Sequence, residues 1–443
     1  MKKIAPVKIL VIHVHSSRNA GDAALLAATL DQLYARFPGA VITLAMNEPA
    51  SFSGRERAIG SFTWWFKTVV EGRSVWRKAM LLKLPFLFLA SAVYALATRW
   101  GTGRFRLISQ ECQQLLDAYA EADLIVSCPG NYFYSSGKLG LPFLFTLWSL
   151  GYALMMGKPT YSMPQTVGPL WRRRDRWLVA RFFRGYRLLF LRDPRSARLL
   201  RSLGLRVQNE QVTPDMAFAL QGIPHQAAER LLAERGISLN QPLLGVTAMD
   251  WGLQNSRFGR QPEYEAAIAG AVRWFITHYD GAAVFFAQVH GPSNAEDDRK
   301  VVARISKQLS DIQDRVFLVT DIGEPWTLQS LYGCMDIFLG TRLHSCIFAM
   351  TAGTPALAIA YQSKTWGIYE SLGLDKYVID IDDVTELQLI RKLDRLWAER
   401  TRVRSHLHEQ IKVIQAQITA IGARIARDFH QLRGVNSITR YGH

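Results

Sequence analysis

The stretch Gly340-Thr341-Arg342-Leu343-His344-Ser345 lies between an apolar run, Cys334–Leu339, and a helix-like segment, Cys346–Pro355. The apolar run predicts a buried strand, and the second segment predicts a helix ended by a glycine and a proline. Arg342 and His344 are therefore expected in a strand-to-helix turn, at the sheet edge where open α/β folds bind ligands. A helix N-terminus and an arginine suit an anion, and a histidine can transfer a proton near neutral pH. The alternative is a turn with two solvated polar residues.

Strand-like runs alternate with helical patterns along most of the chain, which predicts parallel sheets. The first group of runs is Ile9–Val14, Val41–Ala45, Leu124–Cys128, Pro159–Met163 and Leu188–Leu191. The second group is Leu243–Ala248, Ala283–Ala287, Val316–Val319, Ile337–Leu339 and Ala356–Ala360. We expect an α/β protein with two Rossmann-like doubly wound domains that face a central crevice. The expected divisions are residues 1–222 with an apolar insertion at 62–106, residues 223–380, and a helical C-terminal segment, 381–443.

The chain has 443 residues and a formal net charge of +16, which is compatible with nucleic acid, an anionic membrane surface or an acidic substrate as partner. The segment Trp171–Arg206 carries twelve arginines against two aspartates, as a solvated helix face or a membrane-facing patch would. The four cysteines have no metal-ligand spacing, so we expect no metal site, and reduced thiols fit the cytosol. The apolar run after Lys8 is short and β-branched, which predicts a first strand rather than a signal peptide.

Further candidate residues follow the other strand-like runs. Asn19 and Asp22 precede a helix expected from Ala23, so either can cap that helix or contact a ligand. Lys364 follows the last run, where an ammonium group can neutralise an anion near Arg342. A plain surface lysine is the alternative. The remaining candidates for substrate binding at this edge are Gly130, Asn131, Gln165, Arg192 and His290.

The segment 62–106 departs from the alternation of strands and helices. It contains Trp64-Trp65-Phe66 and a nearly all-apolar run, Ala79–Thr98, with basic residues on both sides. Such a run can cross a bilayer, but a crossing would place strands of one sheet on opposite sides of the membrane, and the flanking charges show no asymmetry. Two interpretations stay open: an interfacial hairpin on an anionic membrane surface, or helices packed on the first domain or on a second copy of the chain.

Taken together, the loops from Ile9 to about Tyr369 resemble those of the polysaccharide pyruvyl transferase family. The most specific part is Arg342-Leu343-His344, followed by a Gly-x-Pro strand and Lys364. The other matching elements come in the family's order: Asn19-x-Gly21-Asp22, Pro129-Gly130, Gln165 to Pro169, Arg192-Asp193 with Ser196, and Asp215. The chain departs from the family at Cys128-Pro129-Gly130-Asn131, where a run of glycines is usual, and the 62–106 insertion lies outside the shared core.

The resemblance implies a fold like that of two-domain glycosyltransferases of the GT-B type. It implies transfer of pyruvate from phosphoenolpyruvate to a sugar, as a ketal or an enol ether, with release of phosphate. Arg342, Lys364 and Arg192 would hold the phosphate and carboxylate of phosphoenolpyruvate. His344 would act as general acid on the methylene carbon, or as base on the sugar hydroxyl, which makes His344 and Arg342 the catalytic candidates. No cofactor is implied, since phosphoenolpyruvate is a co-substrate, and the acceptor would belong to a cell-surface or exopolysaccharide precursor that is commonly lipid-linked.

Two other functions compete with this one. A GT-B-type glycosyltransferase with a nucleotide-sugar donor would use a similar crevice and similar cations, because fold does not set chemistry. A non-catalytic basic scaffold on a membrane or nucleic acid is the second rival, but the chain has no nucleic-acid-binding motif and its loops are expected to converge on one site. We expect a cytoplasmic enzyme without a nucleic-acid partner, peripheral on the inner face of the plasma membrane if the insertion binds lipid.

Overall fold

The computed structural model describes residues 6–70, 84–101, 110–135, 140–205, 210–255, 257–291 and 294–440. Contacts divide the chain into two compact units. Unit 1 comprises Met1–Ser17, Leu25–Met216 and Gln417–His443, and unit 2 comprises Arg18–Ala24 and Ala217–Ala416. The sequence places the change of domain at residue 222 and treats residues 381–443 as a separate segment. The contacts change unit after Met216 and divide the C-terminal helix between the two units.

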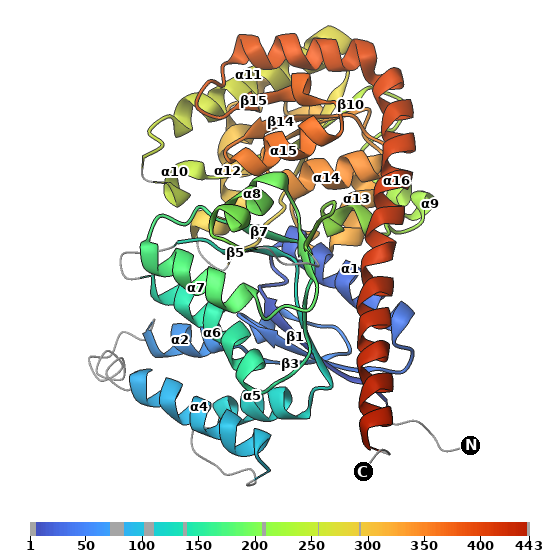
Figure 1. Ribbon diagram of the computed structural model, residues 1–443. Helices are drawn as coiled ribbons and strands as arrows, with labels where there is room; N and C mark the ends of the chain where they lie inside the picture. Colours follow the sequence, from blue (N-terminus) through green and yellow to red (C-terminus); the bar gives the residue numbers. More distant parts are fainter. Residues whose placement is uncertain are drawn as a thin grey trace. The chain divides into compact units, whose positions relative to one another are not determined.

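Unit 2 is built on a six-stranded sheet in which neighbouring strands are all parallel (Figure 1). Its strands are β10 (Leu243–Thr247), β11 (Ala282–Phe286), β12 (Val316–Val319), β13 (Ile337–Gly340), β14 (Ala356–Ala360) and β15 (Val378–Asp380). Their order is β12-β11-β10-β13-β14-β15. The chain thus winds outward from β10 in one direction and then from β13 in the other. This is the doubly wound Rossmann order, and its ligand-binding switch point lies between β10 and β13.

The strands of unit 2 are almost uniformly apolar because helices cover both faces of a parallel sheet. Every residue of β10, β11, β13 and β14 is buried. The helices of this unit are α9 (His225–Ala233), α10 (Trp251–Gln254), α11 (Gln261–Tyr279), α12 (Asp298–Lys307), α13 (Pro325–Gly333), α14 (Leu343–Thr351) and α15 (Ser363–Ser371). Short 3-10 turns occur at Met216–Ala219, Asn294–Glu296, Ser310–Arg315 and Asp375–Tyr377.

Unit 1 contains a parallel sheet of the same winding, in the order β3-β2-β1-β4-β6. Its strands are β1 (Lys8–Val14), β2 (Val41–Met46), β3 (Arg57–Gly60), β4 (Leu124–Ser127) and β6 (Thr160–Ser162). A second sheet has the order β5-β7-β8-β9, with β5 (Gly130–Phe133), β7 (Gln165–Val167), β8 (Leu189–Leu191) and β9 (Glu210–Val212). The predicted α/β class with two Rossmann-like sheets is confirmed, and each strand-like run of the sequence coincides with a strand to within one or two residues.

Two prolines explain why two strands of unit 1 were not predicted from the sequence. Pro129 and Pro164 interrupt the chain after β4 and β6, because proline donates no ladder hydrogen bond. After each proline the chain resumes as a strand, β5 or β7, rather than as a loop. Gly130 and Asn131, expected in a turn at the sheet edge, therefore lie on β5. Gln165, expected in a loop, begins β7.

The remaining helices of unit 1 include the segment that the sequence singled out as an insertion. They are α1 (Ala20–Arg36), α2 (Phe62–Val70), α4 (Leu84–Arg99), α5 (Gln110–Glu121), α6 (Leu141–Met155), α7 (Arg173–Phe183) and α8 (Pro194–Ser202), with a 3-10 turn at Pro49–Ser51. The α1 helix begins in the Arg18–Ala24 stretch, which belongs to unit 2 by its contacts. Residues 71–83 and 102–106 of the insertion lie outside the described residues.

The described part of the insertion is packed on α6, as one of the two open interpretations requires. Phe66 stacks on Phe145 with ring centroids 4.6 Å apart, and Phe88 contacts Phe145 and Trp148 at 5.1 and 4.8 Å. Both Trp64 and Trp65 are half-buried. The inner faces of α2 and α4 are thus part of the unit 1 core. Packing inside the unit, and not contact with a membrane, positions the side chains of Trp64, Trp65 and Phe88.

The helix α16 (Glu386–Arg440) confirms that the C-terminal segment is helical, as the sequence predicts. It buries leucine, valine and isoleucine residues at spacings of three, four and seven, among them Leu389, Leu393, Leu396, Val403 and Leu407. Across the described parts of the chain, none of the helices combines the length and hydropathy that a bilayer crossing needs.

Candidate functional site

The candidate site lies in unit 2, where β10 and β13 end side by side at the switch point of the sheet. The Thr341 N–H donates to the Thr247 carbonyl at 3.1 Å, and the hydroxyls of Thr247 and Ser345 lie 2.6 Å apart. The Tyr264 hydroxyl contacts the Thr341 hydroxyl at 2.6 Å. These contacts fix the turn from β13 to α14, on which Arg342 and His344 lie.

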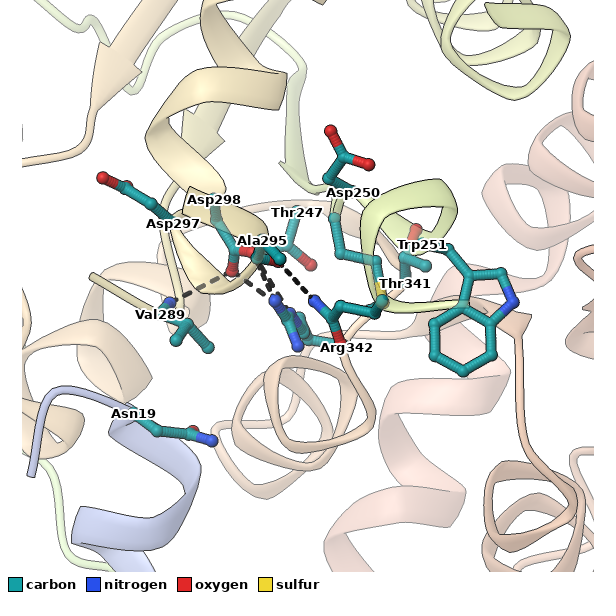
Figure 2. A network of polar contacts seen from close by, with 12 residues as sticks. Asn19, Thr247, Asp250, Trp251, Val289, Ala295, Asp297, Asp298, Thr341 and Arg342 are labelled. Carbon is teal, nitrogen blue, oxygen red and sulfur yellow. Dashed lines mark hydrogen bonds and ion pairs between the residues drawn. The ribbon is translucent and has the colours of Figure 1, made fainter. Parts of the chain in front are cut away.

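Arg342 is the residue before α14, and its guanidinium forms a buried ion pair with Asp298 at the start of α12 (Figure 2). Nη2 donates to Oδ1 of Asp298 at 2.6 Å, and Nε lies 3.2 Å from both carboxylate oxygens. The side chains are 12% and 1% exposed. Burial lowers the pKa of the guanidinium, but attraction to Asp298 outweighs it and holds that pKa above its usual range. The charge of Arg342 is therefore permanent and partly neutralised within the protein.

The Asp298 carboxylate occupies only one side of the Arg342 guanidinium, so the other side can contact a ligand. Asp298 uses Nε and Nη2 of Arg342, so Nη1 is the remaining donor group of the fork. The same carboxylate accepts from the Val289 N–H at 3.0 Å, which ties the start of α12 to the segment after β11. The sequence did not predict the pairing of Asp298 with Arg342.

His344 lies in the first turn of α14, because the helix begins at Leu343 and not near Cys346 as the sequence predicted. Its imidazole is half-buried and lies against Gly21. A methyl group on Gly21 would come within 2.2 Å of Nδ1 of His344, so only glycine permits this approach. The resemblance named Gly21 as a family position, and the structure gives it this steric role.

The stretch that contains Gly21 runs along the segment after β11. The Ala20 N–H donates to the Gln288 carbonyl at 3.1 Å, and the His290 N–H donates to the Arg18 carbonyl at 3.0 Å. Asn19 caps α1, since its Oδ1 accepts from the Gly21 N–H at 2.9 Å. The α1 helix therefore begins at Ala20, three residues earlier than predicted, and Asp22 lies in its first turn.

His290 adds a second half-buried imidazole to this part of unit 2. Its Nε2 is buried and forms no hydrogen bond with any residue that the structure describes. Burial and the nearby Arg299 lower the pKa of this imidazole, so the neutral form predominates near pH 7. A neutral, unpartnered ring nitrogen can accept from or donate to a ligand.

Lys364 lies on the first turn of α15, beside the ring of Tyr361. Its Nζ is 5.9 Å from the Tyr361 ring centroid, and Tyr361 contacts Trp251 at 4.7 Å between centroids. Tyr361 also contributes to the pKa of Arg342, which places the tyrosine near the guanidinium. Within the described residues Lys364 forms no ion pair, so its charge is uncompensated. Figure 2 shows Trp251 and Asn19 around the same Arg342–Asp298 pair.

Three further candidates, Gln165, Arg192 and Asn131, lie in unit 1. Gln165 is fully buried, and its Nε2 donates to the Ser127 hydroxyl at 3.1 Å, so it braces the kink between β4 and β5. Arg192 is also buried, with Nη1 2.9 Å from Asp215 and Nε 3.0 Å from the Thr166 hydroxyl. Asn131 is half-buried on β5. Gln165 thus lies on a strand with a buried side chain, and not in the loop that the sequence predicts.

Sequence reasoning missed three residues of the unit 2 site: Asp298, Trp251 and Tyr361. Two of them carried a signal, since Trp251 follows β10 by four residues and Tyr361 directly follows β14, which are the positions that the switch-point rule selects. Asp298 carried none, because no pattern pairs two residues that are 44 positions apart. No cluster of three or more metal-ligating side chains occurs in the part of the chain that the structure describes.

Comparisons with known proteins agree with the resemblance seen in the sequence. A family model described as polysaccharide pyruvyl transferase matches residues 19–363, most of the chain. The amylovoran biosynthesis protein AmsJ of Erwinia amylovora is 24% identical over 421 residues, which cover 94% of this chain and 98% of that protein.

Solved structures support the fold alone. A glycosyltransferase from Rickettsia africae has a TM-score of 0.56 at 11% identity and covers 96% of this chain and 99% of its own. Anabaena Alr3699/HepE, solved in complex with UDP-glucose, has a TM-score of 0.51 at 14% identity and covers 96% and 99%. These are similarities to enzymes with Rossmann-like domains of the GT-B type, as the sequence led us to expect.

Proposed function

Since the chain belongs to the polysaccharide pyruvyl transferase family, we propose that it transfers the pyruvate unit of phosphoenolpyruvate to a sugar of a cell-surface or exopolysaccharide precursor and releases phosphate. The similarity to a protein of amylovoran biosynthesis supports an exopolysaccharide as the destination. The observation that carries the proposal is the grouping of Arg342, His344 and Lys364 in unit 2, at the ends of neighbouring strands.

The charges of this group suit a small molecule with two anionic ends. The N–H groups of the first turn of α14 and Nη1 of Arg342 can receive one anionic group. Lys364 supplies a full positive charge for the other, since Asp298 already offsets that of Arg342. Phosphoenolpyruvate carries a phosphate and a carboxylate, and both are anionic at neutral pH.

The addition of the sugar to phosphoenolpyruvate requires two proton movements. The methylene carbon of phosphoenolpyruvate gains a proton, which leaves C2 electrophilic, and a sugar hydroxyl attacks C2 and loses its own proton. Attack by a second hydroxyl of the sugar, with departure of the phosphate, completes a ketal; loss of phosphate and a methyl proton gives an enol ether instead. His344 is the group that we assign to the proton transfer, as acid toward the carbon or as base toward the hydroxyl. Cations beside the departing phosphate stabilise its growing charge.

The finer parts of the proposal concern the acceptor and the place of action. We propose a lipid-linked saccharide acceptor and an enzyme at the inner face of the plasma membrane. The insertion of unit 1 and its basic neighbours support this location.

A phosphate-release assay tests the reaction directly. The enzyme is mixed with phosphoenolpyruvate and a panel of nitrophenyl or lipid-linked sugars, and we expect phosphate release that depends on one of the sugars. A product mass that exceeds the acceptor by a pyruvate unit identifies the ketal or enol ether. Absence of acceptor-dependent release across a panel that includes the authentic precursor would contradict the proposal.

Variants test the assigned roles. His344→Ala should still bind phosphoenolpyruvate in calorimetry but lose about 10²-fold or more in turnover, the range of lost general acid–base catalysis. Arg342→Ala should weaken that binding by at least about 2 kcal/mol, the range of a lost charge-assisted contact. His408→Ala is the matched control, because His408 is exposed on α16. Equal turnover of the His344 and His408 variants would make His344 a structural residue.

A nucleotide-sugar glycosyltransferase is the second candidate, and one observation favours it. Trp251 and Tyr361 present two contacting rings beside Arg342, where a nucleobase could stack. The Anabaena relative in fold is described with UDP-glucose bound. Saturable binding of a nucleotide sugar in calorimetry, with no binding of phosphoenolpyruvate, would favour this candidate over pyruvyl transfer.

A further inference from the structure

We propose that unit 1 docks on an anionic lipid bilayer through one exposed surface, formed by an apolar stripe on α4 and a basic face on α7. The proposal deepens the proposed function, on which it rests only for the identity of the lipid-linked acceptor. Within the two segments that the sequence singled out, it selects the residues that the structure leaves exposed, since Trp64, Trp65 and Phe88 pack at least partly inside the unit.

The apolar stripe consists of Leu89, Val93, Leu96 and Trp100, which follow one another at helical spacing. They are 63%, 46%, 38% and 73% exposed. The opposite side of α4 is held in place, because Tyr94 is fully buried and its hydroxyl donates to Asp117 at 2.6 Å. The inner face of the helix thus fixes its orientation, and its outer face presents a row of large apolar side chains to solvent. Soluble proteins commonly expose single apolar residues, whereas a contiguous row of them is typical of an interaction surface.

The basic face consists of Arg173, Trp177, Arg181 and Arg184 on the outer side of α7. Val179 and Phe183 on the inner side are fully buried, so the orientation of the helix is settled. Trp177 is 65% exposed. Tryptophan and arginine side by side are the residues that locate at the headgroup level of a membrane, where an amphipathic ring and a cation are both satisfied.

Both helices pack on α6 and reach its C-terminal end. Arg99 of α4 donates through Nη1 to the carbonyl of Met155 at 3.2 Å. The backbone after α7 returns to the same place, since Gly185 lies against the Leu154 side chain. In Figure 1, α7, α6, α2 and α4 follow one another as helices of unit 1, and contacts join α6 to each of the other three. The stripe and the basic face therefore belong to one helical layer.

Charge selects an anionic bilayer over a second copy of the chain as the occupant. The segment Trp171–Arg206 holds twelve arginines and two aspartates. Neither aspartate offsets the outer face, because Asp175 is fully buried and pairs with Arg172 and Arg174, and Asp193 caps α8. A symmetric interface between two copies would bring such arginine-rich faces toward each other, whereas anionic headgroups attract them.

Vesicle flotation tests the proposal with the full chain and no substrate. Wild type is mixed with vesicles of phosphatidylglycerol and phosphatidylcholine in equal parts, and with vesicles of phosphatidylcholine alone, at low and high salt. We expect binding to the anionic vesicles, weakened by salt but not abolished, because salt screens the arginines and leaves the apolar stripe.

Two variants separate the contributions. Arg173→Gln, Arg181→Gln and Arg184→Gln together should weaken partition roughly 100-fold at low salt, since each cation near an anionic surface contributes about a factor of five. Leu89→Ser, Val93→Ser, Leu96→Ser and Trp100→Ser together should abolish the binding that persists at high salt. The matched control changes exposed residues of α16: Leu387→Ser, Val413→Ser, Arg391→Gln and Lys412→Gln.

Circular dichroism confirms that each variant is folded, and all of them should release phosphate from phosphoenolpyruvate with a soluble sugar acceptor as wild type does. Vesicle binding equal to wild type in both surface variants would overturn the proposal. A second result would also overturn it: light scattering shows that the wild type is a dimer and the α4 variant a monomer, and the wild type does not bind vesicles. The stripe would then be a subunit interface. Failure of the phosphate-release assay in wild type would count against the proposed function and leave the flotation result standing.

Discussion

The Arg342–Asp298 pair allows a quantitative prediction, because both partners are buried and their contacts are short. Removing one partner of a buried pair costs about 3–5 kcal/mol, since the other charge is left uncompensated. Asp298→Ala leaves the buried Arg342 charge without its partner and the Val289 N–H without its acceptor, so we expect about 4 kcal/mol of destabilisation. Arg342→Met keeps the volume, and the carboxylate keeps its backbone donor, so we expect about 3 kcal/mol.

The double variant is the decisive measurement. With both charges gone, no buried ion is left unpaired, and we expect about 4 kcal/mol in total rather than the sum of the single effects. The coupling energy is then about 3 kcal/mol, which urea unfolding of the four proteins can measure. A coupling below about 0.5 kcal/mol would refute the claim that the two side chains form a buried pair that neutralises charge.

The same variants separate structure from ligand binding. If Arg342 only holds the fold, the double variant should bind phosphoenolpyruvate in calorimetry as tightly as wild type. If Nη1 contacts the ligand, affinity should stay low in the double variant, by the same factor as in Arg342→Met. The second result is the one that we expect.

Three further predictions follow from single contacts. Burial lowers the pKa of His13 from 6.5 to about 4, so the unfolded chain binds this proton more readily than the folded protein does. The free energy of unfolding should therefore fall by about 2 kcal/mol between pH 8 and pH 5. His13→Asn, which tolerates the φ of 61°, should flatten that part of the pH profile, and an unchanged profile would contradict the assignment. Gly21→Ala should displace His344 and lower turnover about tenfold or more, as lost positioning of a general acid does, while Gly434→Ala should not. Lys364→Ala should weaken phosphoenolpyruvate binding more at low than at high salt, and Lys364→Arg should restore most of it; a salt-independent effect would count against a charge contact.

The sequence predicted the strands of both sheets well, for a physical reason. Parallel strands covered on both faces are continuous apolar runs, so Leu243–Thr247 and Ala356–Ala360 are visible without alternation. The missed strands, such as β5 and β7, are short and follow prolines. Gly, Asn and Gln at their starts are typical of turns, and only the neighbouring strands of the second sheet make them extended.

The site was predictable to the extent that it depends on chain order. Arg342, His344 and Lys364 follow strands, and the switch-point rule places such residues at one edge. The pairing of Arg342 with Asp298 and the approach of Gly21 to His344 depend on how distant segments pack, which no spacing in the sequence encodes. The arginine-rich α7 was visible in the sequence, but which arginines face outward is fixed by the burial of Val179 and Phe183.

The ion pair changes how the anion-binding function should be understood. A guanidinium joined to a buried carboxylate attracts a distant anion weakly, because the two charges nearly cancel beyond a few ångströms. What Asp298 provides is a fixed direction, since it holds Nε and Nη2 and so aims Nη1. Attraction must then come from Lys364 and from the first turn of α14, and Arg342 supplies an oriented donor. Lys364 would attract a substrate with two anionic groups, and Arg342 would align it. Lys364 variants should therefore change the association rate and Arg342 variants the dissociation rate. Stopped-flow binding can measure both rates.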